Sequence, residues 1–288
     1  MQKNRVKALV LITAGLLGLA VAVVLVAVLK YYALVAIALL MLWSVVIENA
    51  WLKVERLTVN SSKVDQTVRL LQISDFHSNG WVLRHIKRVI AEEHPDAIVL
   101  TGDTFDWERL DNDSARDLVR YLAGLKIPVL LIYGQHEMDC PEFWHEVKLL
   151  MPDRIQYLGC RSSAIAPDVS CFGADFDSQK LRFQLNDARF NILLTYTPGD
   201  AMVYADRFDF DLILCGHEHG GQVRLPLIGA VLDASGRLFS DWRGYHTRGV
   251  FKHNKSLIYV DSGAGYSIMP VRFLCRSQVT LITIGAQK

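Results

Sequence analysis

Four short motifs place carboxylate and imidazole side chains where several of them could share one metal ion. They are Asp75-Phe76-His77, Gly102-Asp103 with Asp106, Gly134-Gln135-His136-Glu137, and Gly216-His217-Glu218-His219. A single histidine is more often structural than a ligand, whereas four such motifs in one chain favour a metal centre. Mixed oxygen and imidazole ligands are typical of Mn, Fe and Zn sites.

Each motif follows a short apolar segment that predicts a β-strand. These strands are expected at residues 67–74, 97–101, 128–133 and 211–215. Ligands of open α/β sheets bind beyond the carboxyl ends of the strands, so the motifs are expected to meet at one site. In an extended segment, side chains two positions apart point the same way, which would turn Asp75 with His77, and His217 with His219, toward that site.

Segments with helical periodicity alternate with strands along the rest of the chain. Helices are expected at residues 82–93, 114–125 and 141–150, and further strands at 169–173, 190–196, 257–261 and 279–284. This alternation predicts an α/β domain.

Taken in chain order, the four motifs resemble the signature of the calcineurin-like metallophosphoesterases, and the resemblance covers residues 67–288. Residues 216–226 (GHEHGGQVRLP) and 261–273 (DSGAGYSIMPVRF) are similar to a membrane-associated branch of that family. This branch includes YkuE-like hydrolases and UDP-diacylglucosamine pyrophosphatases. The resemblance implies an αββα sandwich of the metallophosphoesterase type.

The resemblance also implies two divalent metals, of the Mn, Fe or Zn kind, at a shared site. Its ligands would be Asp75, His77, Asp103, Gln135, His217 and His219. Asp75, His77 and His219 would hold the first metal, Asp103 would bridge both, and the others would help to hold the second. His136 would act near the phosphate as a general acid or transition-state stabiliser, while a metal-held hydroxide attacks phosphorus in line.

Two positions depart from the family pattern, and both concern the second metal. Gln135 stands where the family has asparagine, and its amide oxygen lies one methylene farther out. Tyr196 stands where the family has histidine, and a phenol with a pKa near ~10 is a poor ligand while it keeps its proton. We therefore expect a well-held first metal and a weakened second one.

The N-terminal region is predicted to be a membrane anchor. Residues 8–47 are uncharged except for Lys30 and are mostly aliphatic. As one straight helix they would measure about 60 Å against a hydrocarbon core of ~30 Å. We therefore expect a two-helix hairpin within residues 1–51, with Lys30, Tyr31 and Tyr32 at its turn. A junction at residues 52–66 and a catalytic domain at residues 67–288 would follow. The alternatives are one span followed by an interfacial helix, or a cleaved signal peptide.

Charge and cysteine content bear on the compartment and the partners. Lys3, Arg5 and Lys7 would stay in the cytoplasm, so a hairpin in a cell inner membrane returns the body there, whereas a single span places it outside. The five cysteines form no CxxC pair, which fits a reducing compartment. The formal net charge is +1, and the chain beyond Lys30 is mildly acidic, so nucleic acid is not an expected partner.

These observations together predict a membrane-anchored, metal-dependent phosphoesterase or pyrophosphatase. Its expected substrate is a phosphate ester or diphosphate of a lipid or of a nucleotide-linked lipid at the bilayer. The alternative is a catalytically weakened member of the family that binds one metal or a phosphorylated ligand. Phe105, Trp107, Trp242 and Tyr245 could form an apolar rim, but ordinary packing is the favoured interpretation. Arg243, Arg248 and Arg272 could contact phosphate, but surface charge is the favoured interpretation.

Overall fold

The computed structural model describes residues 2–106, 112–140, 155–176, 178, 182–267 and 269–286; the side chains of residues 2–12 and 14 lie outside this description. The chain forms two compact units, Met1–Trp43 and Ser44–Lys288. The helix predicted at residues 141–150 falls outside the described residues.

The first unit is one apolar helix, α1 (Gln2–Leu42). The predicted hairpin is therefore wrong, because the helix continues without a turn through Lys30, Tyr31 and Tyr32. Between residues 19 and 50 the sequence contains no glycine or proline that could break a helix, and neither lysine nor tyrosine does so by itself. By length and composition, residues Gly15–Ala50 could cross a membrane.

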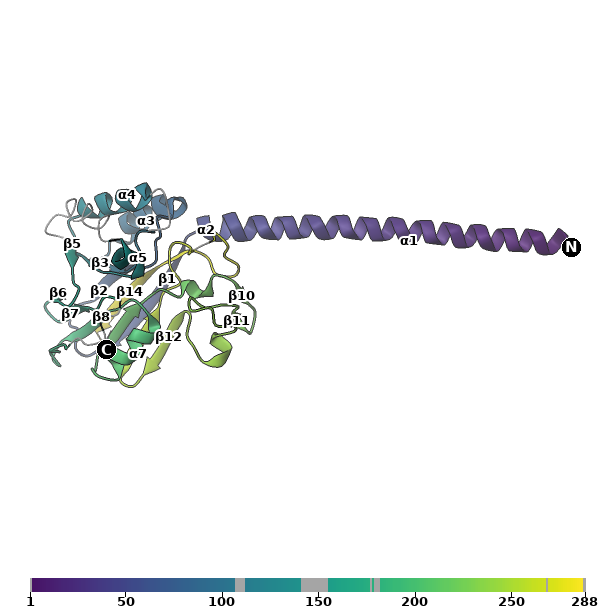
Figure 1. Ribbon diagram of the computed structural model, residues 1–288. Helices are drawn as coiled ribbons and strands as arrows, with labels where there is room; N and C mark the ends of the chain where they lie inside the picture. The colour runs from purple at the N-terminus through teal and green to yellow at the C-terminus, as the bar shows by residue number, and fades with distance from the viewer. Residues whose placement is uncertain are drawn as a thin grey trace. The chain divides into compact units, whose positions relative to one another are not determined.

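The second unit contains two six-stranded sheets (Figure 1). The strand order of the first sheet is β1-β14-β2-β3-β4-β5. Its strands are β1 (Lys53–Ser61), β14 (Gln278–Ala286), β2 (Val68–Ile73), β3 (Ala97–Thr101), β4 (Val129–Ile132) and β5 (Ile155–Tyr157). Strands β2 to β5 are parallel, so their carboxyl ends lie along one edge of the sheet.

The second sheet has the strand order β12-β13-β9-β8-β7-β6. Its strands are β12 (Gly249–His253), β13 (Ser256–Val260), β9 (Leu212–Cys215), β8 (Phe190–Leu194), β7 (Val169–Gly173) and β6 (Ser162–Ala166). The four central strands, β13 to β7, are parallel. A two-stranded hairpin, β10 (Arg224–Leu225) and β11 (Gly229–Ala230), follows β9 in the chain.

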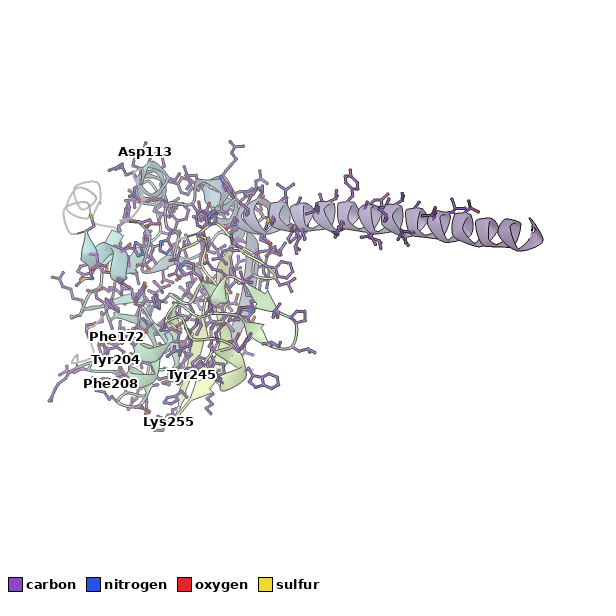
Figure 2. The ribbon with its side chains drawn as sticks, turned by 45° about the vertical axis from the view of Figure 1, so that its right-hand side comes forward. Asp113, Phe172, Tyr204, Phe208, Tyr245 and Lys255 are labelled. Atoms are coloured by element: carbon purple, nitrogen blue, oxygen red, sulfur yellow. The ribbon has the colours of Figure 1, made fainter. Side chains whose placement is uncertain are left out.

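The buried apolar side chains form three clusters, one on the outer face of each sheet and one between the two sheets. Helices α3 (Gly80–Glu93) and α4 (Asp113–Ala123) cover one face of the first sheet, where residues such as Leu71 are buried. The next residue, Leu70, points to the opposite face and packs between the two sheets. Helix α7 (Pro198–Ala205) covers the second sheet through a cluster that includes Tyr204 and Phe172 (Figure 2). This is the predicted αββα sandwich.

The predicted strands and helices among the described residues are present within a few residues of their expected ends. The segment 52–66, expected to be a junction, instead contains strand β1, which pairs with β14. Its polar residues alternate along a half-exposed edge strand, and this hides the strand in the sequence. Strands β5, β6 and β12 were also not predicted.

Candidate metal centre

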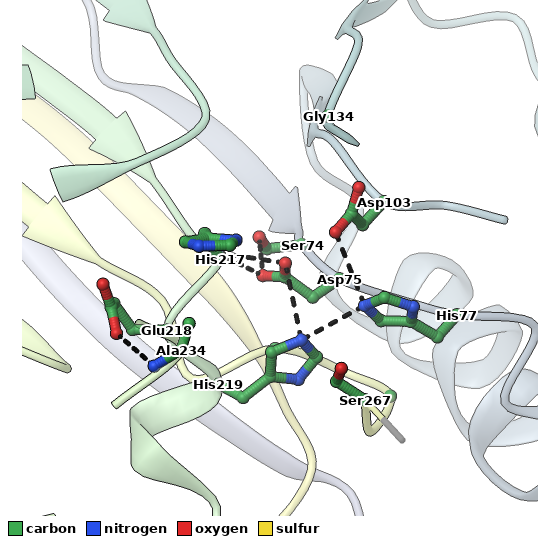
Figure 3. A network of polar contacts seen from close by, with 12 residues as sticks. Ser74, Asp75, His77, Asp103, Gly134, His217, Glu218, His219, Ala234 and Ser267 are labelled. Carbon is green, nitrogen blue, oxygen red and sulfur yellow. Dashed lines mark hydrogen bonds and ion pairs between the residues drawn. The ribbon is translucent and has the colours of Figure 1, made fainter. Parts of the chain in front are cut away.

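Side chains that follow three of the parallel strands converge in one buried cluster. Asp75 follows β2, Asp103 follows β3, and His219 comes after β9. The Nε2 atoms of His77 and His219 lie 3.1 Å apart. His77 Nε2 is 3.6 Å from Asp103 Oδ2, and His219 Nε2 is 3.8 Å from Asp75 Oδ1 (Figure 3). The structure thus brings together the four residues expected at the first metal.

The donors of this cluster fit a divalent cation. Two overlapping groups have ligand atoms within 4.8 Å of one another: Asp75 with His77 and His219, and His77 with Asp103 and His136. Imidazole nitrogens and carboxylate oxygens are the donors of Mn, Fe and Zn sites. Burial, together with His77 and Arg272, places the pKa of His219 well below its usual range, so its ring is neutral and can offer a lone pair. Burial and the nearby Asp103 raise the pKa of Asp75, as expected for negative charge in a buried site that a cation would offset.

The backbone at this cluster is strained. Asp75, His77, Asp103, His217 and His219 all have positive φ, with values between 43° and 70°. Few non-glycine residues adopt this left-handed conformation, and its clustering is typical of functional sites. The prediction that Asp75 and His77 project from an extended segment is therefore wrong, although both side chains still reach the site.

Glu137 fixes the loop that carries Asp103. Its buried carboxylate accepts hydrogen bonds from the backbone N–H groups of four residues: Asp103 and Gly134 at 2.9 Å, Thr104 at 2.7 Å and Phe105 at 3.3 Å. Burial and the neighbouring Asp103 raise the pKa of Glu137 to about 7. The backbone of Gly134 lies so close to Asp103 and Tyr196 that a Cβ at this position would be 2.7 Å from both the Asp103 nitrogen and Tyr196 Cε2. The sequence motif contains Glu137, but this role was not predicted.

His136 lies next to the cluster, at the start of the short helix α5 (Gln135–Asp139). Its ring packs edge-on against His77 with 4.7 Å between ring centroids, and its Nδ1 lies 3.3 Å from Asp106 Oδ1. Burial lowers the pKa of His136, but the contact with Asp106 and the charge of Asp103 outweigh it, so the net shift is upward. His136 is therefore readily protonated, and Asp106, which the prediction left without a role, orients it.

The residues expected at the second metal are arranged differently. The Tyr196 hydroxyl donates to Asp103 Oδ2 at 2.5 Å and lies 2.7 Å from His217 Nδ1. Tyr196 is fully buried, and burial with Asp103 and Asp75 raises its pKa well above the usual value, so the phenol keeps its proton. The side chain of Gln135 is exposed, and the described part of the chain shows no polar contact from it to the cluster. The structure thus joins His217 to Asp103 through Tyr196 and leaves Gln135 outside, because α5 turns that side chain toward solvent.

The structure decides between the alternatives for Arg272 and Phe105. Arg272, considered as a phosphate contact, is fully buried and donates to the carbonyl oxygens of Ser262, Gly263 and Cys275. Phe105 belongs to the core beneath α3 and α4 and not to an exposed rim. Trp242, Tyr245, Arg243 and Arg248 are exposed, and Trp107 lies outside the described residues.

Comparison with known proteins gives one consistent family. The family model for calcineurin-like phosphoesterases matches residues 68–221. The uncharacterised metallophosphoesterase YkuE of Bacillus subtilis is 28% identical over 241 residues, which is 75% of this chain and 78% of that protein. The phosphodiesterase YaeI of Escherichia coli is 29% identical, covering 75% of this chain and 82% of YaeI. The UDP-2,3-diacylglucosamine pyrophosphatase LpxG of Chlamydia muridarum is 24% identical, covering 69% and 78% respectively.

Proposed function

Because the chain belongs to the calcineurin-like phosphoesterase family, whose model matches more than half of its residues, we propose that it is a metal-dependent phosphoester hydrolase. The observation that carries this proposal is the buried convergence of Asp75, His77, Asp103 and His219. These four residues would hold one divalent metal of the Mn, Fe or Zn kind. When bound, such a metal supplies Lewis acidity toward a phosphoryl oxygen.

The residues around the metal position have distinct tasks in this proposal. His136 donates a proton to the leaving oxygen, because Asp106 and Asp103 raise its pKa and so favour the protonated ring, and because that ring lies against His77. Asp106 orients His136 through the contact at Nδ1. Glu137 holds the Asp103 loop in place through its bonds to four backbone N–H groups.

We propose that the second metal position is weak. A second cation would need Asp103 and His217, and both are already in contact with the Tyr196 hydroxyl. The Tyr196 hydroxyl thus occupies the space between the two groups that a second cation would need as ligands. This same contact favours the alternative function, a family member that binds one metal or a phosphorylated ligand and turns over slowly.

The proposed substrate is a phosphorylated lipid or a nucleotide-linked lipid. Two observations support it: the similarity to LpxG and the apolar segment Gly15–Ala50, which would hold the site at a bilayer. Phosphodiester cleavage in general is supported by the similarity to YaeI.

We propose that a single helix anchors the chain. The expected cytoplasmic position of the body depended on two spans, and one continuous helix with Lys3, Arg5 and Lys7 inside would place the body outside the cytoplasm. Alkaline phosphatase fused to the C terminus is then expected to be active in the periplasm. An inactive fusion that is produced at a normal level would contradict this orientation.

Metal removal tests the proposed activity directly. Full-length protein in detergent is stripped with a chelator and reloaded with Mn²⁺, Fe²⁺ or Zn²⁺. We expect hydrolysis of a chromogenic phosphodiester to disappear on stripping and to return with about one metal per chain, since the converging donors would hold one cation. If metal returns but no phosphodiester or UDP-linked diacylglucosamine is cleaved, the binding function replaces the hydrolase function.

A further inference from the structure

The segment 224–248 exposes an unusual number of large apolar side chains for a folded unit. Leu227 is fully exposed, Trp242 is 74% exposed, and Leu238 and Leu274 are about half exposed. A cavity of about 540 Å³ lies among them, lined by Arg224, Leu227, Trp242, Arg248 and Leu274. We call residues 224–248 with Leu274 the hairpin face. Exposed apolar groups gathered in this way mark an interaction surface.

The charges of the hairpin face are positive. Its two carboxylates are neutralised, because Asp241 pairs with Arg224 at 2.8 Å and Asp233 pairs with Arg237 at 2.6 Å. Arg243 and Arg248 remain exposed, and among the described residues no carboxylate forms an ion pair with either. Two copies of this face would bring like charges together, whereas an anionic lipid surface complements both the cations and the apolar side chains.

The hairpin face adjoins the point at which the apolar segment enters the second unit. Residues 44–50 are the last part of the segment Gly15–Ala50 and belong to the second unit. Ser44 accepts a hydrogen bond from the Arg272 nitrogen at 2.9 Å, and Glu48 accepts one from the Leu274 nitrogen at 3.2 Å. Leu274 in turn lines the cavity, and Figure 1 shows α2 (Glu48–Ala50) and β10 on the same side of the unit.

The same face is connected to the metal centre through one side chain. Arg224 donates to the carbonyl oxygen of Gly220 at 2.6 Å, and Gly220 directly follows His219. Contact of the hairpin face with a bilayer would therefore hold the loop of a metal-centre residue close to lipid headgroups.

We propose that the hairpin face docks onto the anionic leaflet of the membrane that holds the apolar segment. Leu227 and Trp242 enter the boundary between headgroups and acyl chains, and Arg243 and Arg248 contact anionic headgroups. This inference rests on the proposed membrane anchoring but not on the proposed hydrolysis. The docked orientation presents phosphorylated lipid to the metal centre from the plane of the bilayer.

A depth measurement on the full chain tests the docking. Cys140 and Cys160, the cysteines that are not buried, are changed to serine, and a polarity-sensitive fluorophore is attached at Leu227→Cys. The control label is at Asp117→Cys on α4, and Figure 2 shows Asp113 of that helix far from Tyr245 of the hairpin face. Each protein is reconstituted into phosphatidylcholine vesicles with or without phosphatidylglycerol and with nitroxide-bearing lipid.

We expect several-fold stronger quenching at residue 227 than at residue 117, and stronger quenching in the anionic vesicles. The double variant Arg243→Gln, Arg248→Gln should lower the ratio of docked to undocked protein by roughly twenty-five-fold, because each of the two cations near an anionic surface contributes about fivefold. Arg120→Gln, a matched exposed arginine on α4, should leave this ratio unchanged.

Flotation of the vesicles separates the possible failures. A chain that floats with the vesicles but shows equal quenching at both labels overturns the docking and leaves the anchoring intact. A chain that does not float overturns both. Shielding of the label at residue 227 that grows with protein concentration in detergent, without lipid, would assign the face to a second copy and overturn the docking. Phosphodiester hydrolysis, measured in parallel, is independent of all three outcomes.

Discussion

Replacing His219 with alanine is expected to release the metal and to lower phosphodiester hydrolysis at least about a thousandfold. His219 is buried, and its Nε2 lies within 3.1 Å of His77 and 3.8 Å of Asp75. Gly220 and Gly221 follow it, so the loop offers no replacement donor. With three donors left in a buried and negatively charged site, we expect the metal to exchange readily with solvent.

The control is His85→Ala on α3, which removes an exposed imidazole outside the cluster. We expect this variant to keep its metal and its rate. Metal content is measured by mass spectrometry of the purified proteins, and the melting temperature in detergent shows that each variant is folded. A folded His219→Ala protein that keeps its metal and a rate within about tenfold of wild type would show that the cluster is not the metal centre.

The location of the site was predictable because it depends on topology more than on side-chain detail. Apolar segments ending in Asp or His gave the strands, and parallel strands bring their carboxyl ends to one edge. The motifs meet at this edge although their local conformation differs from the predicted one, because Asp75 and His77 have a left-handed and not an extended backbone. The alternation of strands and helices predicted an α/β domain in the same way, whereas the αββα order came from the resemblance to the family.

The features that were missed depend on contacts between distant residues. Glu137 acts on backbone groups more than thirty residues earlier in the chain, and Arg272 becomes buried only because the carbonyl groups of residues 262–276 surround it. Nothing in their own segments signals either role. The two-helix membrane hairpin was predicted from the thickness of a bilayer, which limits the length of a membrane span but does not break a helix that has no glycine or proline between residues 19 and 50.

Substitution of Tyr196 tests whether its phenol weakens the second metal position. We expect Tyr196→His to raise the metal content from about one to about two per chain, because imidazole can bind a cation without losing a proton. It would also free Asp103 Oδ2 and His217 Nδ1 from the phenol. Adding Gln135→Asn should contribute less, since the side chain at this position faces solvent and would have to turn inward.

The matched control is Tyr196→Phe, which removes the hydroxyl without adding a ligand. If the phenol alone blocked a second cation, this variant would also gain metal; if a donor is needed, only the histidine variant gains it. We expect the second result, with a rate increase of roughly tenfold to a hundredfold in the histidine variant, since a second metal stabilises the leaving oxygen. Two metals in the wild type, with no faster double variant, would refute the weakened second position. An inert wild type with active variants would instead mean that Tyr196 has turned a hydrolase fold into a binding protein.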